Sequence, residues 1–280
     1  TGSMPMTTPT ALDSFIDKWR SRWPEWSAAE VFVAGTGSDP SLAWFALLQE
    51  FDDILNIAGD PLPADAKLGW WAAELRDWAG QRSRHPLGRL LEPRPAPWAE
   101  LAHALPTLVA ARERPVDTDA AFAALSGYAR AACAVEAALL GAPPGADALA
   151  AQVLAARLVQ AGPAALPLAL ESGDAGDPAA AGRARQAWAG ELLDRWPAAS
   201  TASRPRRIYA RFARHRLRQQ AAGRLPQSGR QPLGELWRAW RAAASSPPRR
   251  TIWQGSWNVA DSPILRRPTR PRHCRWMRRR

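Results

Sequence analysis

Apolar residues recur three and four positions apart along most of this 280-residue chain, which is the spacing of helix faces that pack on a core. No stretch alternates apolar and polar residues with a period of two between hairpin turns. The pattern therefore predicts an all-α fold. The expected helices cover residues 12–23, a short segment from 27, 40–58, 65–82, 97–113, 117–140, 146–160, 179–196, 205–222 and 233–243.

Capping residues and prolines set the expected ends of these helices. Ser27 and Glu30 have the spacing of a capping box, so Ser27 is the expected N-cap of the short helix. Pro106 is expected to kink or break the helix over 97–113. The helices over 117–140 and 146–160 are apolar nearly all round, which predicts a central position for both.

Composition divides the chain into one helical domain and two ends. Residues 9–244 are expected to form a single-domain helical bundle, long enough to bury a sizeable core. Thr1-Gly2-Ser3 before Met4 resembles the remnant of a cloning tag, and residues 1–8 are expected to be flexible. Proline and arginine dominate residues 245–280, where the helical spacing stops, which predicts a poorly ordered basic tail.

Few features point to a membrane-spanning, secreted or metal-binding protein. No apolar run has the length of a membrane span, and no secretory signal pattern is found. Two cysteines, Cys133 and Cys274, do not make a disulfide framework, and the four histidines lack metal-ligand spacing with them. The expected location is the cytoplasm, with contact at the periphery of a membrane as an extension of that expectation.

Charge is distributed unevenly within the net total of +11. Residues 200–280 hold 21 Arg and two acids, whereas residues 1–199 hold 16 basic and 24 acidic residues. Such asymmetry indicates contact with phosphates or acidic groups, although a solvated arginine-rich surface gives the same pattern. Several arginines of the helix over 205–222 are expected to project from one side, and five are the candidate anionic-surface site: Arg206, Arg207, Arg211, Arg214 and Arg218.

An anionic membrane surface or an acidic protein, including a second copy of this chain, is the expected partner of that basic side. Tyr209 and Phe212 are the aromatic residues nearby, and both suit the core equally well. Sparse aromatics for stacking on bases argue against nucleic acid as the partner.

Two adjacent carboxylates stand out in the predicted helix over 40–58. Asp52 and Asn56 are four residues apart and share a helix face, and Asp53 lies about 100° away. Oxygen ligands on one face are what Mg²⁺ requires when substrate phosphates and water complete its octahedron. Asp52, Asp53 and Asn56 are therefore the candidate metal ligands. The residues that follow have a recognisable spacing: Leu68, Trp71, Glu74, Leu75, Gly80, His85 and Pro86.

Together these segments resemble the squalene/phytoene synthase family. The resemblance implies an isoprenoid-synthase type of helical bundle, in which two aspartate-rich motifs hold magnesium while two prenyl diphosphates are condensed. In the string Gln49 to Asn56, Asn56 stands where the family has a third aspartate. Gln49 stands where the family often has an arginine.

The second aspartate-rich motif of that family has no counterpart here. Ala161 to Pro167 occupies its place, and no carboxylate lies between Asp147 and Glu171. Because magnesium facing a diphosphate needs carboxylates from both sides, we expect a non-catalytic protein without a cofactor. It would bind a prenyl or other apolar ligand, or act in assembly or regulation. The alternatives are an active Mg²⁺-dependent condensing enzyme with substituted phosphate ligands, and a binder of membranes or nucleic acid through the basic third.

Overall fold

The computed structural model describes residues 10–33, 40–171, 177–197, 201–224 and 241. It confirms the all-α prediction, since the described residues form helices and no strand. The chain divides into two units, Thr1–Ser246 and Pro247–Arg280, and every described residue belongs to the first. Apart from Arg241, the predicted helix over 233–243 lies outside the described residues, as do residues 1–8 and the tail 245–280.

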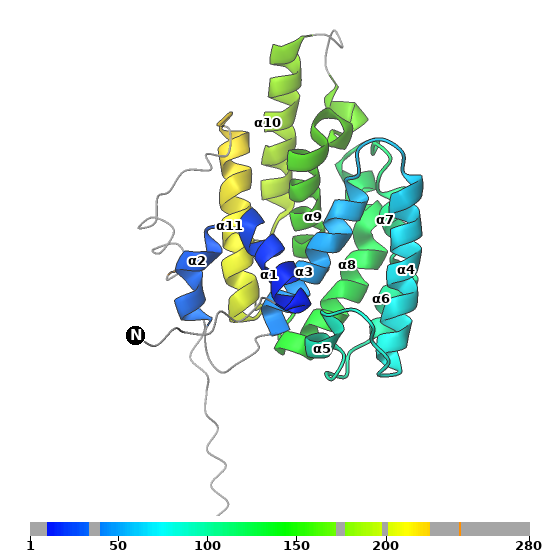
Figure 1. The fold of residues 1–280 in the computed structure, drawn as a ribbon. Helices are drawn as coiled ribbons and strands as arrows, with labels where there is room; N and C mark the ends of the chain where they lie inside the picture. The colour runs from blue at the N-terminus through cyan, green and yellow to red at the C-terminus, as the bar shows by residue number, and fades with distance from the viewer. Residues whose placement is uncertain (1–9, 34–39, 172–176, 198–200, 225–240, 242–280) are drawn as a thin grey trace, which may run out of the picture. The chain divides into compact units, whose positions relative to one another are not determined.

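Eleven α-helices and three short 3₁₀ segments make up the described part of the chain (Figure 1). They are α1 (Ala11–Arg22), α2 (Trp26–Ala29), η1 (Glu30–Phe32), α3 (Pro40–Leu55), α4 (Leu62–Ala79), α5 (Gly88–Leu91), α6 (Trp98–Ala104), α7 (Thr107–Ala110), α8 (Thr118–Leu140), α9 (Ala146–Ala161), η2 (Gly162–Ala165), η3 (Leu168–Leu170), α10 (Pro178–Arg195) and α11 (Arg204–Ala221).

Local chemistry explains most helix ends. Thr10 and Asp13 form a reciprocal capping box at α1, and the Asp117 side chain accepts a 2.8 Å hydrogen bond from the Ala120 N–H at α8. Gly141 ends α8 with φ of 79°, a left-handed conformation that glycine adopts without strain. The predicted cap at Ser27 is wrong, because α2 already begins at Trp26 and the Ser27 hydroxyl donates to the Pro24 carbonyl at 2.8 Å.

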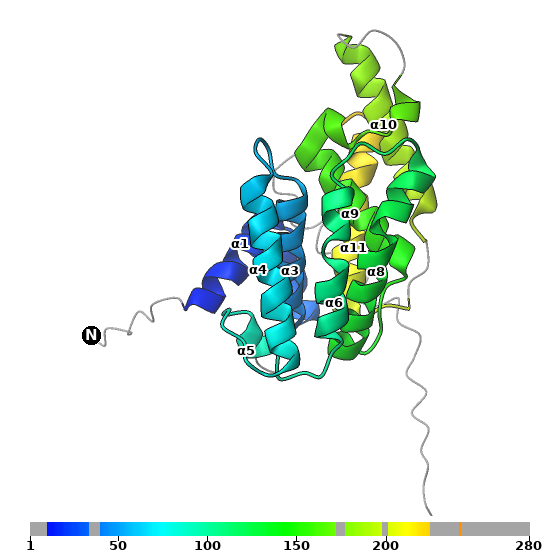
Figure 2. The same cartoon turned by 90° about the vertical axis from the view of Figure 1, so that its right-hand side faces the viewer.

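Helix α3 runs through the middle of the packing and contacts α1, α4, α5, α7, α8 and α9. Figure 2 shows α4 and α6 beside it, with α8 and α9 adjoining. Every residue from Ala43 to Phe51 is buried. The carboxylates near the C-terminal end of α3 therefore belong to a helix that the surrounding protein encloses. The predicted central position of α8 and α9 agrees with their contacts, since both touch α3 and each other.

Aromatic side chains fill much of this interior. Seven tryptophans are almost fully buried: Trp19, Trp26, Trp44, Trp71, Trp78, Trp98 and Trp188. Ring centroids lie 4.8 Å apart for Phe45 and Tyr209 and 5.1 Å apart for Trp78 and Trp98. Burying a large apolar side chain contributes roughly 1.5–3 kcal/mol, so these rings account for a large share of the favourable packing.

Among the described helices, one, α8, is long and apolar enough to cross a membrane by length and composition alone. In the structure this helix packs against α3, α6, α7 and α9.

Candidate functional site

The carboxylates of α3 meet basic side chains from the two neighbouring helices, α1 and α4. Packing of α1 and α4 on α3 brings together five residues, named here the ion-pair cluster: Lys18, Arg22, Glu50, Asp53 and Lys67. Lys18 and Lys67 are the only lysines of the 280-residue chain, and both are used here.

Glu50 is buried and each of its carboxylate oxygens accepts a hydrogen bond from a lysine. Lys18 Nζ lies 2.6 Å from Oε1 and Lys67 Nζ lies 2.6 Å from Oε2. Burial alone raises the pKa of Glu50, but the two lysine hydrogen bonds outweigh that effect and hold its pKa below the ordinary value. Glu50 therefore stays charged and fully occupied by protein donors.

Asp53 is held in the same way from the α1 side. Its oxygens lie 3.1 Å from Lys18 Nζ and 3.0 Å from an Arg22 guanidinium nitrogen, and Gln49 donates a further hydrogen bond at 3.0 Å. The predicted metal ligand thus has three protein donors on its two oxygens.

Asp52 lies next to this cluster but takes part in none of its ion pairs. Burial and, as a smaller cause, the neighbouring charge of Asp53 together raise the pKa of Asp52 to about 8, against the opposing effects of Arg22 and Arg206. The charge of Asp52 also helps to raise the pKa of the buried tyrosines Tyr128 and Tyr209, although burial is the larger cause for both. The Tyr128 hydroxyl has no hydrogen-bond partner among the described residues.

Asn56, the third predicted ligand, is engaged at both ends of its amide. Its nitrogen donates to the Asp52 backbone carbonyl at 2.8 Å, and its oxygen accepts from Arg157 at 3.3 Å. The polar contacts of Asp52, Asp53 and Asn56 thus differ: Asp53 is held by Lys18, Arg22 and Gln49, Asn56 by Arg157 and the Asp52 carbonyl, and Asp52 takes part in no ion pair of the cluster. Within the described ranges, no group of three His, Cys, Asp or Glu residues is arranged to hold a metal ion.

A buried ion pair lies at the centre of the helices, where sequence reasoning placed none. Arg206 of α11 is 1% exposed and Glu136 of α8 is 0% exposed. Arg206 Nε donates to the two Glu136 oxygens at 2.8 and 3.0 Å, and Trp44 Nε1 donates to Oε2 at 2.8 Å. The prediction that Arg206 belongs to a basic surface is therefore wrong, because it neutralises a carboxylate in the core.

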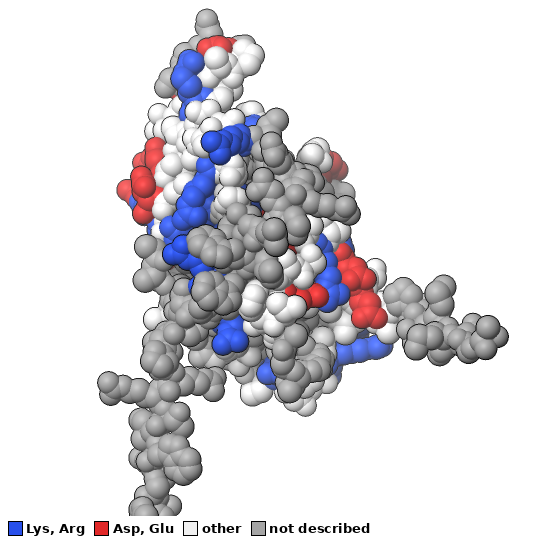
Figure 3. Space-filling model, turned by 90° about the vertical axis from the view of Figure 1, so that its left-hand side faces the viewer, with Lys and Arg blue, Asp and Glu red and all other residues white. Residues whose placement is uncertain are grey.

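Helical spacing places the other predicted arginines of α11 on one side of that helix. They share it with Arg204, and we call these five residues the arginine face: Arg204, Arg207, Arg211, Arg214 and Arg218. Figure 3, which shows the side where α11 lies in Figure 1, has a line of basic side chains running along it. Arg204 donates to the Phe32 carbonyl at 3.4 Å, and Arg214 donates to the Pro197 carbonyl at 2.7 Å.

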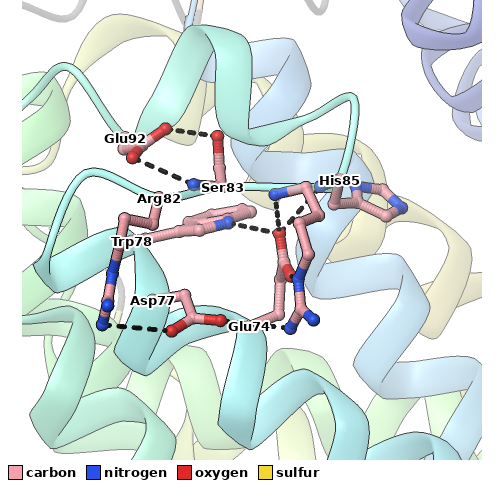
Figure 4. Close-up of polar contacts among 8 residues, drawn as sticks. Glu74, Asp77, Trp78, Arg82, Ser83, His85 and Glu92 are labelled. Atoms are coloured by element: carbon pink, nitrogen blue, oxygen red, sulfur yellow. Dashed lines mark hydrogen bonds and ion pairs between the residues drawn. The ribbon is translucent and has the colours of Figure 1, made fainter.

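Two of the residues that carried the family resemblance after α3, Glu74 and His85, stabilise a turn. Glu74 is fully buried and one of its oxygens accepts from Trp78 Nε1 at 2.9 Å and from the backbone N–H groups of Arg84 and His85 at 2.7 Å each (Figure 4). The carboxylate thereby fixes the turn that follows α4. His85 Nδ1 accepts from the Leu87 N–H at 3.2 Å, so this histidine also stabilises the turn.

No family model, curated protein or solved structure matches this chain.

Proposed function

We propose that this protein is a non-catalytic relative of the squalene/phytoene synthases that acts by binding an anionic surface through the arginine face. In this proposal the carboxylates of α3 no longer serve a metal, because side chains of the protein itself supply the positive charge.

The observation that carries the proposal is the state of Glu50 and Asp53. Lys18, Lys67 and Arg22 approach their oxygens at 2.6 to 3.1 Å and provide three positive charges for two carboxylates. A Mg²⁺ ion would have to displace these donors, and it would then lack carboxylates from an opposing helix, since the chain has none between Asp147 and Glu171. Without a metal cluster, the leaving-group charge of an allylic diphosphate would lack the divalent cations that take it up in the family.

The enzymatic alternative is tested directly with substrate. Purified protein incubated with Mg²⁺ and farnesyl or geranylgeranyl diphosphate is expected to release no diphosphate above the rate without protein. Release that disappears in both Asp52→Ala and Asp53→Ala variants would refute the non-catalytic proposal and support a condensing enzyme.

The arginine face supports the binding part of the proposal. Arg204, Arg214 and Arg218 recur at helical spacing, and the printed sequence places no acidic residue in α11. The hydrogen bonds of Arg204 and Arg214 go to backbone carbonyls, and no carboxylate of the described residues neutralises their charge. Tyr209 and Phe212 are 2% and 1% exposed, which leaves them in the core and removes base stacking as a use for them. A line of cations without stacking groups suits anionic lipid headgroups.

Binding to vesicles tests this surface. The Arg204→Gln/Arg218→Gln variant should bind phosphatidylserine-containing vesicles about thirtyfold more weakly at low salt, because each arginine near such a surface contributes about 1 kcal/mol. The matched control is Arg89→Gln/Arg130→Gln, which removes the same charge from exposed positions on α5 and α8. Equal weakening in both variants, or binding that ignores salt, would reject the arginine face as the site. An acidic protein as partner would leave the wild type unbound to vesicles.

A further inference from the structure

A cavity of 210 Å³ lies where α7, the segment after it, α8 and α9 meet. Small and apolar side chains form most of its wall, among them Ala111, Ala121, Ala124 and Leu154. Three charged residues complete the lining, namely Glu113, Arg114 and Arg157. This cavity is separate from the ion-pair cluster and from the arginine face.

Arg157 is the unusual member of this wall, since it is a buried cation without an acidic partner in the described ranges. Its side chain projects from α9 and the residue is 5% exposed. Its guanidinium donates to the backbone carbonyls of Arg112 and Leu55 and to the side-chain oxygen of Asn56. No carboxylate in the described part of the chain pairs with it, and burial followed by the nearby charge of Arg112 lowers its pKa.

Arg206 and Arg112 show how the positive charge of an arginine is balanced by a carboxylate elsewhere in this protein. Arg206, the other buried arginine of the described residues, is paired with Glu136, and Arg112 is paired with Asp65. Arg157 has instead the carbonyl at the C-terminal end of α3, where a helix carries about half a negative charge. An isolated charge in a dry site is costly, and half a charge does not balance a guanidinium.

We propose that the cavity binds a small organic carboxylate, whose carboxylate pairs with Arg157 and whose apolar part lies against the alanine and leucine side chains. The planar guanidinium matches the two oxygens of a carboxylate, and an anion at this position would supply the charge that the protein itself does not. This inference does not rest on the proposed function.

The walls and the size of the cavity define the class of ligand. At 210 Å³ the cavity is smaller than the roughly 300 Å³ at which pockets for drug-sized ligands begin. Arg114 is engaged by the Leu166 carbonyl at 3.0 Å and by Glu171 at 3.3 Å, and Glu113 adds a negative charge to the wall. One monoanionic group is therefore favoured over a phosphate dianion, and the remaining wall favours a short alkyl chain or a single ring.

Calorimetric titration with hexanoate and benzoate tests the proposal on the full chain. Both probes should bind the wild type saturably, whereas hexanamide, which has the same chain length without the charge, and inorganic phosphate should bind far more weakly. The Arg157→Gln variant should bind the carboxylates about ten- to hundredfold more weakly, as expected for loss of a hydrogen-bonded ion pair.

Because Arg157 also holds the end of α3, a second variant leaves this residue in place. Ala124→Leu puts a larger side chain into the cavity from α8 and should abolish carboxylate binding. Arg130→Gln, which changes an exposed arginine of the same helix, should bind as the wild type does. The proposal is overturned if neither probe binds the wild type, if hexanamide or phosphate binds as well as hexanoate, or if Ala124→Leu binds both probes unchanged.

Discussion

Replacing Arg206 by methionine is expected to be among the most destabilising single changes in this protein. Arg206 is 1% exposed and its partner Glu136 is 0% exposed, so the substitution leaves a carboxylate in the core with no cation beside it. Trp44 Nε1 at 2.8 Å would remain the donor to that carboxylate. Breaking a buried ion pair in this way typically costs about 3–5 kcal/mol, a large fraction of the roughly 5–15 kcal/mol that stabilises a domain.

The double variant Arg206→Met/Glu136→Gln distinguishes two effects of Arg206→Met. One is the charge of Glu136 left without a cation, and the other is the loss of the Arg206 side chain itself. Glutamine can still accept the Trp44 hydrogen bond through its amide oxygen, and no charge then remains at this position. We therefore expect the double variant to be more stable than Arg206→Met alone, with a coupling free energy of about 1–3 kcal/mol between the two positions.

Urea unfolding followed by far-ultraviolet circular dichroism measures these free energies. The exposed control Arg218→Met should change the free energy of unfolding by less than about 0.5 kcal/mol. If Arg206→Met costs less than about 1 kcal/mol, or if the double variant is as unstable as the sum of its single variants, the buried pair does not hold the helices together as described.

Three further changes give distinct outcomes. Because burial raises the pKa of Asp52 from 3.8 to about 8, the folded state retains a proton that the unfolded chain loses, so stability should fall as the pH rises between these values. Asp52→Asn should remove that fall in the melting temperature, and a decline unchanged in the variant would contradict the assignment. Gly88→Ala should destabilise the protein by about 1–3 kcal/mol in urea unfolding, since an added Cβ meets Ser83, whereas Gly69→Ala has open space and serves as control. Glu74→Gln should speed amide hydrogen exchange in the turn after α4, because fewer charge-assisted bonds hold its N–H groups; unaltered exchange there would argue against this role.

Helices with strong local signals were predictable from the sequence. The apolar spacing and the Gly141 turn defined α8 within one or two residues, and Pro106 correctly marked the break between α6 and α7. The predicted cap of α2 is wrong because Glu25 is the N-cap and Trp26 is the first helical residue, which leaves Ser27 inside the helix. Local sequence patterns do not distinguish between two adjacent residues as the first residue of a helix.

The angular positions of the α11 arginines around the helix axis could have shown that Arg206 does not belong to the basic surface. Arg207, Arg211, Arg214 and Arg218 lie within about 60° of one another around the axis, whereas Arg206 lies about 80–140° away from them. Glu136 is a carboxylate within a largely apolar stretch of the sequence, and this exception was the corresponding indication of a buried partner for Arg206.

The partners of Glu50 and Asp53 were not predictable, because they come from α1 and α4. The sequence identifies α3 as the helix that carries the carboxylates, but the packing of its neighbours decides whether cations reach them. The cavity beside Arg157 is likewise set by several segments together, although an arginine within the apolar pattern over 146–160 was visible as an exception.

The concentration of both lysines in one cluster has a practical consequence for mapping complexes. Amine-directed crosslinkers can react along the chain only at Lys18 and Lys67, apart from the terminal amine, and both lysines are bonded to Glu50. Apart from those at the terminal amine, crosslinks formed with such reagents would start from α1 and α4 and from no residue of the arginine face. Dicarbonyl reagents, which modify guanidinium groups, are the chemistry that this molecule requires.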